Sequence, residues 1–238
     1  MTASRATQTV ARWLASLALS FGLLLPLPAG RAQGFDVDLA LVLAVDCSFS
    51  VDSREFALQM HGLGQALMRP EVKKAITQGS RQRIAVAVVQ WSDDINQKVV
   101  LPWTIVANPA DADRLGLVLQ STGRELAQGG TSISTALNFS AALFAAAPAA
   151  ERLVIDVSSD GRNNSGPPVP PVRDRLVAHG ITINGLTILN EWPTLATYFE
   201  NNVAGGPGYF VIPSNDYESY GEAIFRKLLR EITGPGIS

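Results

Sequence analysis

The chain has 238 residues, of which 47% are hydrophobic and 17% charged, and a formal net charge of −2. This length predicts one domain or at most two, with enough apolar material for a sizeable core. The acidic balance argues against a nucleic-acid partner, because phosphate binding needs a basic surface.

Residues 1–32 are predicted to be a secretory signal peptide. Arg5 and Arg12 give a positive start, residues 13–27 are mostly apolar, and Gly30-Arg31-Ala32 offers small residues at the −3 and −1 positions of a cleavage site. The apolar run is shorter than the about 20 residues that a membrane span needs, so an uncleaved N-terminal anchor is the less favoured alternative. No later segment has the pattern of a membrane span. A periplasmic or secreted bacterial protein is therefore expected.

Cleavage would remove three arginines and no acids, which leaves 16 basic and 21 acidic residues and a net charge of −5. Cys47 is the only cysteine, so no intramolecular disulfide is possible. A single cysteine at the end of an apolar run is expected to be a small buried residue.

Strand and helix patterns alternate through the rest of the chain. In chain order the pattern predicts strand 37–45, helix 53–69, strand 83–91, strand 98–106, helix 109–126, helix 134–147, strand 152–158, helix 172–179, strand 181–189, helix 192–203, strand 208–212 and helix 217–232. Ser53 is expected to cap the first helix. Pro102 predicts an edge strand, because proline cannot donate to a ladder, and the prolines of 167–171 predict a stiff surface loop.

This order predicts a single α/β domain over residues 36–234. We expect a doubly wound, mostly parallel sheet with one antiparallel edge strand and helices on both faces, a Rossmann-type three-layer sandwich. In such sheets ligands bind outside the carboxyl ends of the strands.

A carboxylate and two hydroxyls follow the first buried strand. Asp46-Cys47-Ser48-Phe49-Ser50 reads D-x-S-x-S directly after the apolar run 39–45. Alone, this stretch also fits a helix cap and turn, where Asp and Ser are common.

Two further loops are expected at the same edge. Thr131 follows two glycines that let the backbone approach closely, and Asp160 follows strand 152–158. Together with Asp46, Ser48 and Ser50 they offer two carboxylates and three hydroxyls. An oxygen-only set without histidine or thiolate favours Mg²⁺ or Mn²⁺, with Ca²⁺ less favoured and zinc and copper disfavoured.

These motifs resemble those of a von Willebrand factor A-type domain with its metal-ion-dependent adhesion site. The resemblance covers about residues 36–232 and includes D-x-S-x-S, Thr131 in Gly-Gly-Thr-Ser and Asp160 in Ser-Asp-Gly. A narrower resemblance joins the chain to secreted single-domain bacterial proteins of uncharacterised function. It rests on the segment from Val154 to Gly161, which reads VIDVSSDG, and on Asn163-Asn164.

The resemblance implies direct coordination of the metal by Ser48, Ser50 and Thr131, while Asp46 and Asp160 often act through water. It implies a non-enzymatic adhesion module whose metal captures an Asp or Glu carboxylate of a protein partner. In the family the last helix can shift when such a ligand binds. A second metal site would need paired acids just after D-x-S-x-S, where only Asp52 occurs, so none is predicted.

Asp156 lies inside an apolar strand, about 13 Å along the strand from Asp160. Because burial of a bare carboxylate is costly, we expect a structural partner such as an arginine or backbone N–H groups, and Asp156 is not taken as a metal ligand. His61 and His179 lie far from D-x-S-x-S in the sequence, which leaves a Ser-His-Asp triad without support.

Two alternatives to an adhesion module stay open. A metal-assisted hydrolase of phosphate or ester substrates would use an ion-bound water, with Asp156 as its one candidate base. A degenerate module would fold without metal.

Overall fold

The computed structural model describes residues 36–234, and the predicted signal peptide lies outside this range. The strands are β1 (Val37–Asp46), β2 (Ile84–Trp91), β3 (Gln97–Val106), β4 (Ala150–Ser159), β5 (Ile181–Ile188) and β6 (Val211–Ser214). The helices are α1 (Ser53–Met68), α2 (Pro70–Gln78), α3 (Pro109–Ser121), α4 (Ile133–Ala142), α5 (Val169–Ala178), α6 (Leu195–Asn202) and α7 (Tyr220–Thr233), with a 3₁₀ turn at Leu143–Ala146.

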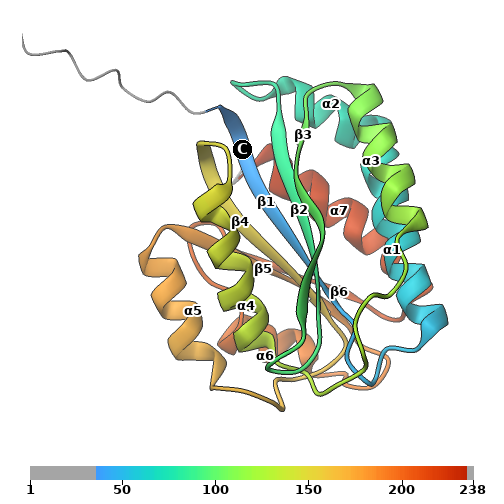
Figure 1. The fold of residues 1–238 in the computed structure, drawn as a ribbon, viewed down its shortest axis with the longest axis vertical. Helices are drawn as coiled ribbons and strands as arrows, with labels where there is room; N and C mark the ends of the chain where they lie inside the picture. Colours follow the sequence, from blue (N-terminus) through green and yellow to red (C-terminus); the bar gives the residue numbers. More distant parts are fainter. Residues whose placement is uncertain (1–35, 235–238) are drawn as a thin grey trace, which may run out of the picture. The chain divides into compact units, whose positions relative to one another are not determined.

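The six strands form one sheet in the order β3-β2-β1-β4-β5-β6 (Figure 1). Only the edge pair β2–β3 is antiparallel. The predicted α/β architecture is therefore confirmed. The chain leaves β1 toward β2 on one side and later returns to β4 on the other, which makes the β1–β4 junction the switch point where such sheets bind ligands.

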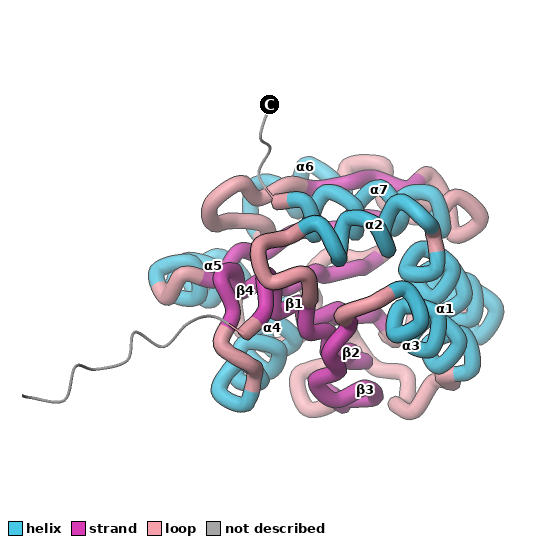
Figure 2. Tube along the Cα trace, turned by 90° about the horizontal axis from the view of Figure 1, so that it is seen from above, coloured by secondary structure: helices cyan, strands magenta, loops and turns pink. Residues whose placement is uncertain are grey.

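Helices cover both faces of the sheet, as Figures 1 and 2 show. One apolar core joins α1, α2, α3 and α7 to one face, and a second joins α4, α5 and α6 to the other. β1 is buried at every position because it lies in the middle of the sheet between these two layers.

Several element boundaries differ from the sequence prediction. α2 was not predicted: it begins at Pro70, directly after the expected end of helix 53–69, and proline is well suited to the first turn of a helix. For the same reason α5 begins at Val169, inside the proline run expected to be a loop. The cap of α1 is Asp52 and not Ser53, since the Asp52 side chain accepts a hydrogen bond from the Glu55 N–H.

The remaining differences concern helix and strand ends. α3 ends at Ser121, five residues before the predicted end, and β6 begins at Val211, three residues later than predicted. Within residues 36–234 no helix has the length and apolar character needed to cross a membrane.

Candidate metal site

The loop after β1 is folded around a buried carboxylate. Asp46 is the last residue of β1 and is fully buried. Its Oδ1 accepts a hydrogen bond of 2.7 Å from the Ser48 N–H, and its Oδ2 accepts one from the Ser159 hydroxyl. The carboxylate thereby ties the D-x-S-x-S turn to the end of β4, the neighbouring parallel strand.

The hydroxyls of this turn meet the second carboxylate. Ser48 Oγ and Ser50 Oγ lie 3.2 Å apart, and Ser50 Oγ donates to Asp160 Oδ1 at 2.7 Å. The other oxygen, Asp160 Oδ2, accepts a 2.9 Å hydrogen bond from the hydroxyl of Tyr217, which precedes α7. Four of the five predicted ligands are thus linked in one hydrogen-bonded group.

Thr131 reaches the same place from the loop before α4. An added Cβ at Gly161 would lie 3.3 Å from Thr131 Oγ1, which puts this hydroxyl against the residue that follows Asp160. Within the described chain no hydrogen bond holds Thr131 Oγ1, while the backbone N–H of Thr131 donates to Asn164 Oδ1 at 2.8 Å. A nearly buried hydroxyl without a partner is available as a ligand.

The two glycines before Thr131 are required by close packing. The Gly129 carbonyl accepts a 2.8 Å hydrogen bond from the Phe49 N–H, and a Cβ at Gly129 would come within 2.3 Å of Asp93 Oδ2. A Cβ at Gly130 would lie 3.0 Å from Asn164 Oδ1. The close backbone approach expected from the sequence is confirmed.

The spacing of these oxygens fits an octahedral hard cation. Adjacent ligands of Mg²⁺ at about 2.1 Å lie about 3.0 Å apart. The separation of Ser48 Oγ and Ser50 Oγ, two of the expected direct ligands, is 3.2 Å, close to this value. Within residues 36–234 there is no cluster of three or more His, Cys, Asp or Glu side chains suited to a metal, so any metal here relies on hydroxyl ligands as well.

Asp46 and Asp160 lie close together, and their repulsion favours a proton on Asp46, which a bound cation would replace. Burial, followed by the charge of Asp160, raises the pKa of Asp46 from 3.8 to about 7. Burial and the same charge also raise the pKa of Tyr217, so its hydroxyl stays protonated and donates. A divalent cation would relieve this repulsion, since ligation needs the deprotonated carboxylate.

Metal binding is therefore expected to depend on pH with a defined sign. Because the folded pKa of Asp46 is raised, its stabilising contribution in EDTA is complete below pH 3.8 and is lost as the pH rises through about 7. Mg²⁺ competes with that proton, so the Mg²⁺-induced rise in Tm should be larger above pH 7 than near pH 5. Thermal unfolding with Mg²⁺ or EDTA across this range measures it, and a rise that is independent of pH would contradict this assignment of Asp46.

Asp156 is held in a separate buried cluster under α7. Lys227 Nζ lies 2.6 Å from Asp156 Oδ1 and 2.6 Å from Glu231 Oε1, and all three side chains are buried. The expectation of a structural partner is confirmed, although the partner is a lysine and not an arginine or backbone N–H groups.

The histidines lie elsewhere. His61 is exposed on α1, and His179 is exposed at the end of α5, where its Nδ1 lies 2.7 Å from the Arg175 carbonyl. Neither has a hydrogen bond to a predicted site residue within the described chain.

Sequence reasoning missed three residues that support the site: Ser159, Asn164 and Tyr217. Ser159 directly precedes Asp160, so its position next to a predicted ligand at the end of a strand was a signal in the local sequence. Asn164 was noted only as part of an asparagine pair. The contact of Tyr217 with Asp160 joins residues 57 positions apart and has no local sequence signal.

Asn164 is expected to be a positioning residue for Thr131. The side-chain Oδ1 of Asn164 accepts a hydrogen bond from the Thr131 N–H at 2.8 Å, and the backbone N–H of Asn164 donates to the Thr131 carbonyl at 2.9 Å. Asn164→Ala should weaken Mg²⁺ binding by about tenfold, since loss of a residue that orients a metal ligand typically lowers metal affinity by about 10–100-fold. Asn164→Asp keeps the acceptor and should stay close to wild type. Calorimetric titration of wild type and both variants with Mg²⁺ tests this role. A Mg²⁺ affinity of Asn164→Ala equal to that of wild type would contradict it.

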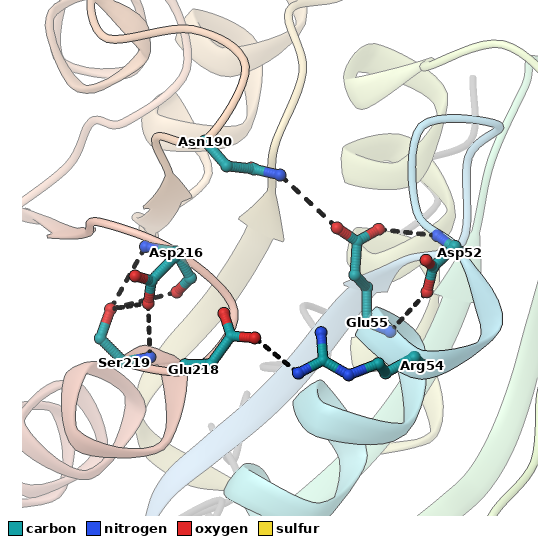
Figure 3. Close-up of polar contacts among 7 residues, drawn as sticks. All are labelled: Asp52, Arg54, Glu55, Asn190, Asp216, Glu218 and Ser219. Carbon is teal, nitrogen blue, oxygen red and sulfur yellow. Dashed lines mark hydrogen bonds and ion pairs between the residues drawn. The ribbon is translucent and has the colours of Figure 1, made fainter.

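The acids beside the site are already engaged (Figure 3). Asp52 and Glu55 form a reciprocal capping box at the start of α1, and Glu55 Oε1 also accepts from the Asn190 side chain at 3.5 Å. Arg54 pairs with Glu218 at 2.6 Å. These contacts join α1 to the loops that follow β5 and precede α7.

Solved structures share this fold. The mussel byssus proximal thread matrix protein 1 superposes with a TM-score of 0.61 at 19% identity, over 84% of this chain and 48% of that one. A von Willebrand factor type A protein from Catenulispora acidiphila gives 0.59 at 18% identity, over 83% and 43%. BatB from Bacteroides thetaiotaomicron gives 0.55 at 15% identity, over 80% and 97%.

The chain thus spans about half the length of the first two of these structures. Another structure of the mussel protein, at 16% identity and a TM-score of 0.57 over 84% of this chain and 49% of that one, has zinc in its MIDAS motif. No curated protein matches the chain.

A family model described as "Protein of unknown function (DUF1194)" matches residues 36–236. The fold is that of a von Willebrand factor A domain, and the chain belongs to the DUF1194 family.

Proposed function

We propose that this protein is a metal-dependent protein-binding module that acts in the periplasm or outside the cell. The observation that carries the proposal is the convergence of three hydroxyls and two carboxylates at the β1–β4 switch point. Ser48, Ser50 and Thr131 would hold Mg²⁺ or Mn²⁺ directly, with Asp46 and Asp160 behind them. The ion would supply an electrophilic position for an Asp or Glu carboxylate of a protein partner.

The hydrogen bonds support this division of roles. Both oxygens of Asp46 already accept hydrogen bonds from Ser48 and Ser159, and both oxygens of Asp160 accept from hydroxyls. Thr131 Oγ1 has no such partner in the described chain. Few full charges near the ion leave it short of one strong ligand, which favours capture of an outside carboxylate.

The site could hold one of several divalent cations. The oxygen-only donor set favours Mg²⁺ or Mn²⁺ over softer metals. The zinc in the MIDAS motif of the mussel protein makes Zn²⁺ a cation to include in any titration.

The hydrolase alternative loses its candidate base. Asp156 is buried beside Lys227 and Glu231 in the interior, with Lys227 Nζ 2.6 Å from its Oδ1. A carboxylate held in this way is not placed to activate a water at the metal edge. We therefore propose a binding role and no catalytic one.

Partner capture from the native envelope tests the proposal. Crosslinking pull-down with wild-type protein in Mg²⁺ should recover a partner that is absent in EDTA and absent with Asp46→Ala. Asp113→Asn is the matched control and should behave as wild type, because Asp113 lies on α3, pairs with Lys73 of α2 and has no contact with a predicted ligand in the described chain. Equal capture under all these conditions would refute a metal-dependent binding role.

A further inference from the structure

Large apolar side chains are exposed in the loops next to the metal site. Phe49, between Ser48 and Ser50, is 76% exposed, and Ile95, in the turn between β2 and β3, is 83% exposed. These are the two most exposed large apolar side chains of the described residues. A single exposed apolar residue is ordinary, so their grouping is what matters.

A series of contacts links the two loops that carry these side chains. The Phe49 N–H donates to the Gly129 carbonyl, and Gly129 in turn packs against Asp93. Asp93 accepts a 3.1 Å hydrogen bond from the Ile95 N–H. One short series of contacts therefore runs from the ligand loop to the β2–β3 turn.

A third exposed apolar side chain lies on the opposite side. Trp192, in the loop after β5, is 46% exposed. Because the sheet order is β2-β1-β4-β5, the turn with Ile95 and the loop with Trp192 flank the β1–β4 junction from opposite directions. Asn190 of the same loop donates a 3.5 Å hydrogen bond to Glu55 at the start of α1 (Figure 3).

Arg162 adds a positive charge beside Trp192. It follows Asp160 by two residues, and its guanidinium carbon lies 5.3 Å from the centre of the Trp192 ring and 5.4 Å from that of Tyr198. Its Nη2 donates to Thr194 Oγ1 at 2.7 Å. No carboxylate of the described chain forms an ion pair with Arg162, so this positioned charge is complementary to an anionic ligand.

We propose that the partner presents an acidic side chain flanked by apolar ones. Its carboxylate would bind at the metal, one apolar neighbour would pack on Phe49 and Ile95, and another on Trp192. Arg162 would favour a further acidic group over a basic one at the Trp192 end. The inference rests on the proposed function, because the metal supplies the central contact.

Displayed peptides with a fixed central residue test this inference. The probe is a library with a central Glu and four random residues on each side, selected on the full chain in Mg²⁺ and in EDTA. A matched library has a central Gln. We expect enrichment that needs both Glu and Mg²⁺, with Leu, Phe or Trp on both flanks and few basic residues.

An enriched peptide is then titrated by fluorescence anisotropy against single variants. Phe49→Ser and Trp192→Ser should each weaken binding by about tenfold, which is the scale expected for removing one well-packed apolar contact. Leu117→Ser is the control, since Leu117 is 59% exposed on α3, a helix that carries no predicted ligand, and should stay within about twofold of wild type.

The two proposals fail in different ways. Mg²⁺-dependent, Glu-dependent enrichment with polar or basic flanks, or unchanged binding by Phe49→Ser and Trp192→Ser, would overturn the inference and leave the metal-dependent role standing. No dependence on Mg²⁺ or on Glu would overturn both. Mg²⁺-dependent self-association that Phe49→Ser abolishes would identify a second copy of this chain as the occupant and would also contradict the proposal.

Discussion

Replacement of Lys227 by methionine should lower the free energy of unfolding by about 3–5 kcal/mol, the usual effect of removing one partner from a buried ion pair. Lys227 is fully buried on the inner side of α7, between Asp156 of β4 and Glu231 one turn further along the helix. In the described chain no hydrogen-bond donor reaches Asp156 Oδ2 or Glu231 Oε2. Without the lysine, two buried carboxyls would face each other with no cation between them.

The loss should grow with pH. Burial, followed by the charge of Glu231, raises the pKa of Asp156 from 3.8 to about 8, and Lys227 opposes this rise. The stabilising contribution of Asp156 is therefore complete below pH 3.8 and is lost as the pH rises through about 8. Removal of Lys227 raises that pKa further, so the methionine variant should be closer to wild type near pH 5 than near pH 8.

Urea unfolding in EDTA at both pH values measures this effect. Arg226→Met changes the exposed neighbour on α7 and should stay within about 0.5 kcal/mol of wild type. Addition of Asp156→Asn and Glu231→Gln to the Lys227→Met chain should recover much of the loss. A loss below about 1 kcal/mol for Lys227→Met at high pH would show that the cluster is not an ion pair of the assumed kind.

Asp46→Asn should have opposite effects with and without metal. The substitution removes one of two adjacent buried charges, so in EDTA above pH 7 the variant should be more stable than wild type by about 1–2 kcal/mol, since one pKa unit corresponds to about 1.4 kcal/mol. Mg²⁺ affinity should fall by about 100-fold.

Higher stability in EDTA together with lower Mg²⁺ affinity distinguishes a residue of the metal site from a purely structural residue. A purely structural Asp46 would lose stability on substitution in any buffer, because its hydrogen bonds with Ser48 and Ser159 would be disturbed. Thermal unfolding in EDTA and in excess Mg²⁺ distinguishes the two, with Asp113→Asn as the unchanged control. Lower stability in EDTA together with an intact Mg²⁺ response would contradict the assignment.

Most of the fold follows from patterns that are local in the sequence. Apolar runs predicted all six strands, and Pro102 correctly placed β3 at the edge of the sheet. The errors lie where one residue type has two structural uses. The prolines of 167–171 were expected to form a loop, and no helix was predicted from Pro70 onward, although proline fits the first helical turn well.

Part of the candidate site was predictable because its carboxylates follow the ends of strands. Parallel strands bring their carboxyl ends to one edge, which places Asp46 and Asp160 together without knowledge of any side-chain contact. Thr131 lies in the loop between α3 and α4, so its place at this edge was expected from the motif and not from a strand end. The support of Asp160 by Tyr217 depends on how α7 docks, and local sequence does not contain that information.

The buried cluster of Asp156, Lys227 and Glu231 has a signal in the sequence that the prediction did not use. Lys227 and Glu231 lie on the same helical stripe as Tyr220, Ala223 and Leu228, all of which are buried. Charged residues at apolar positions of a helix, together with Asp156 inside an apolar strand, predict a buried ion pair. The identity of the partner required the three-dimensional arrangement.

Calorimetric titration of the full chain with Mg²⁺ at a pH above 7 tests the central claim most directly. The arrangement of Asp46, Ser48, Ser50, Thr131 and Asp160 predicts one ion bound per chain, with a rise in Tm that follows saturation. Thr131→Ala should abolish both signals and leave the fold intact, because the Thr131 hydroxyl has no hydrogen bond to lose within the described chain. Absence of heat and of any Tm shift with Mg²⁺, Mn²⁺, Ca²⁺ and Zn²⁺ would contradict the account and favour a module that folds and acts without metal.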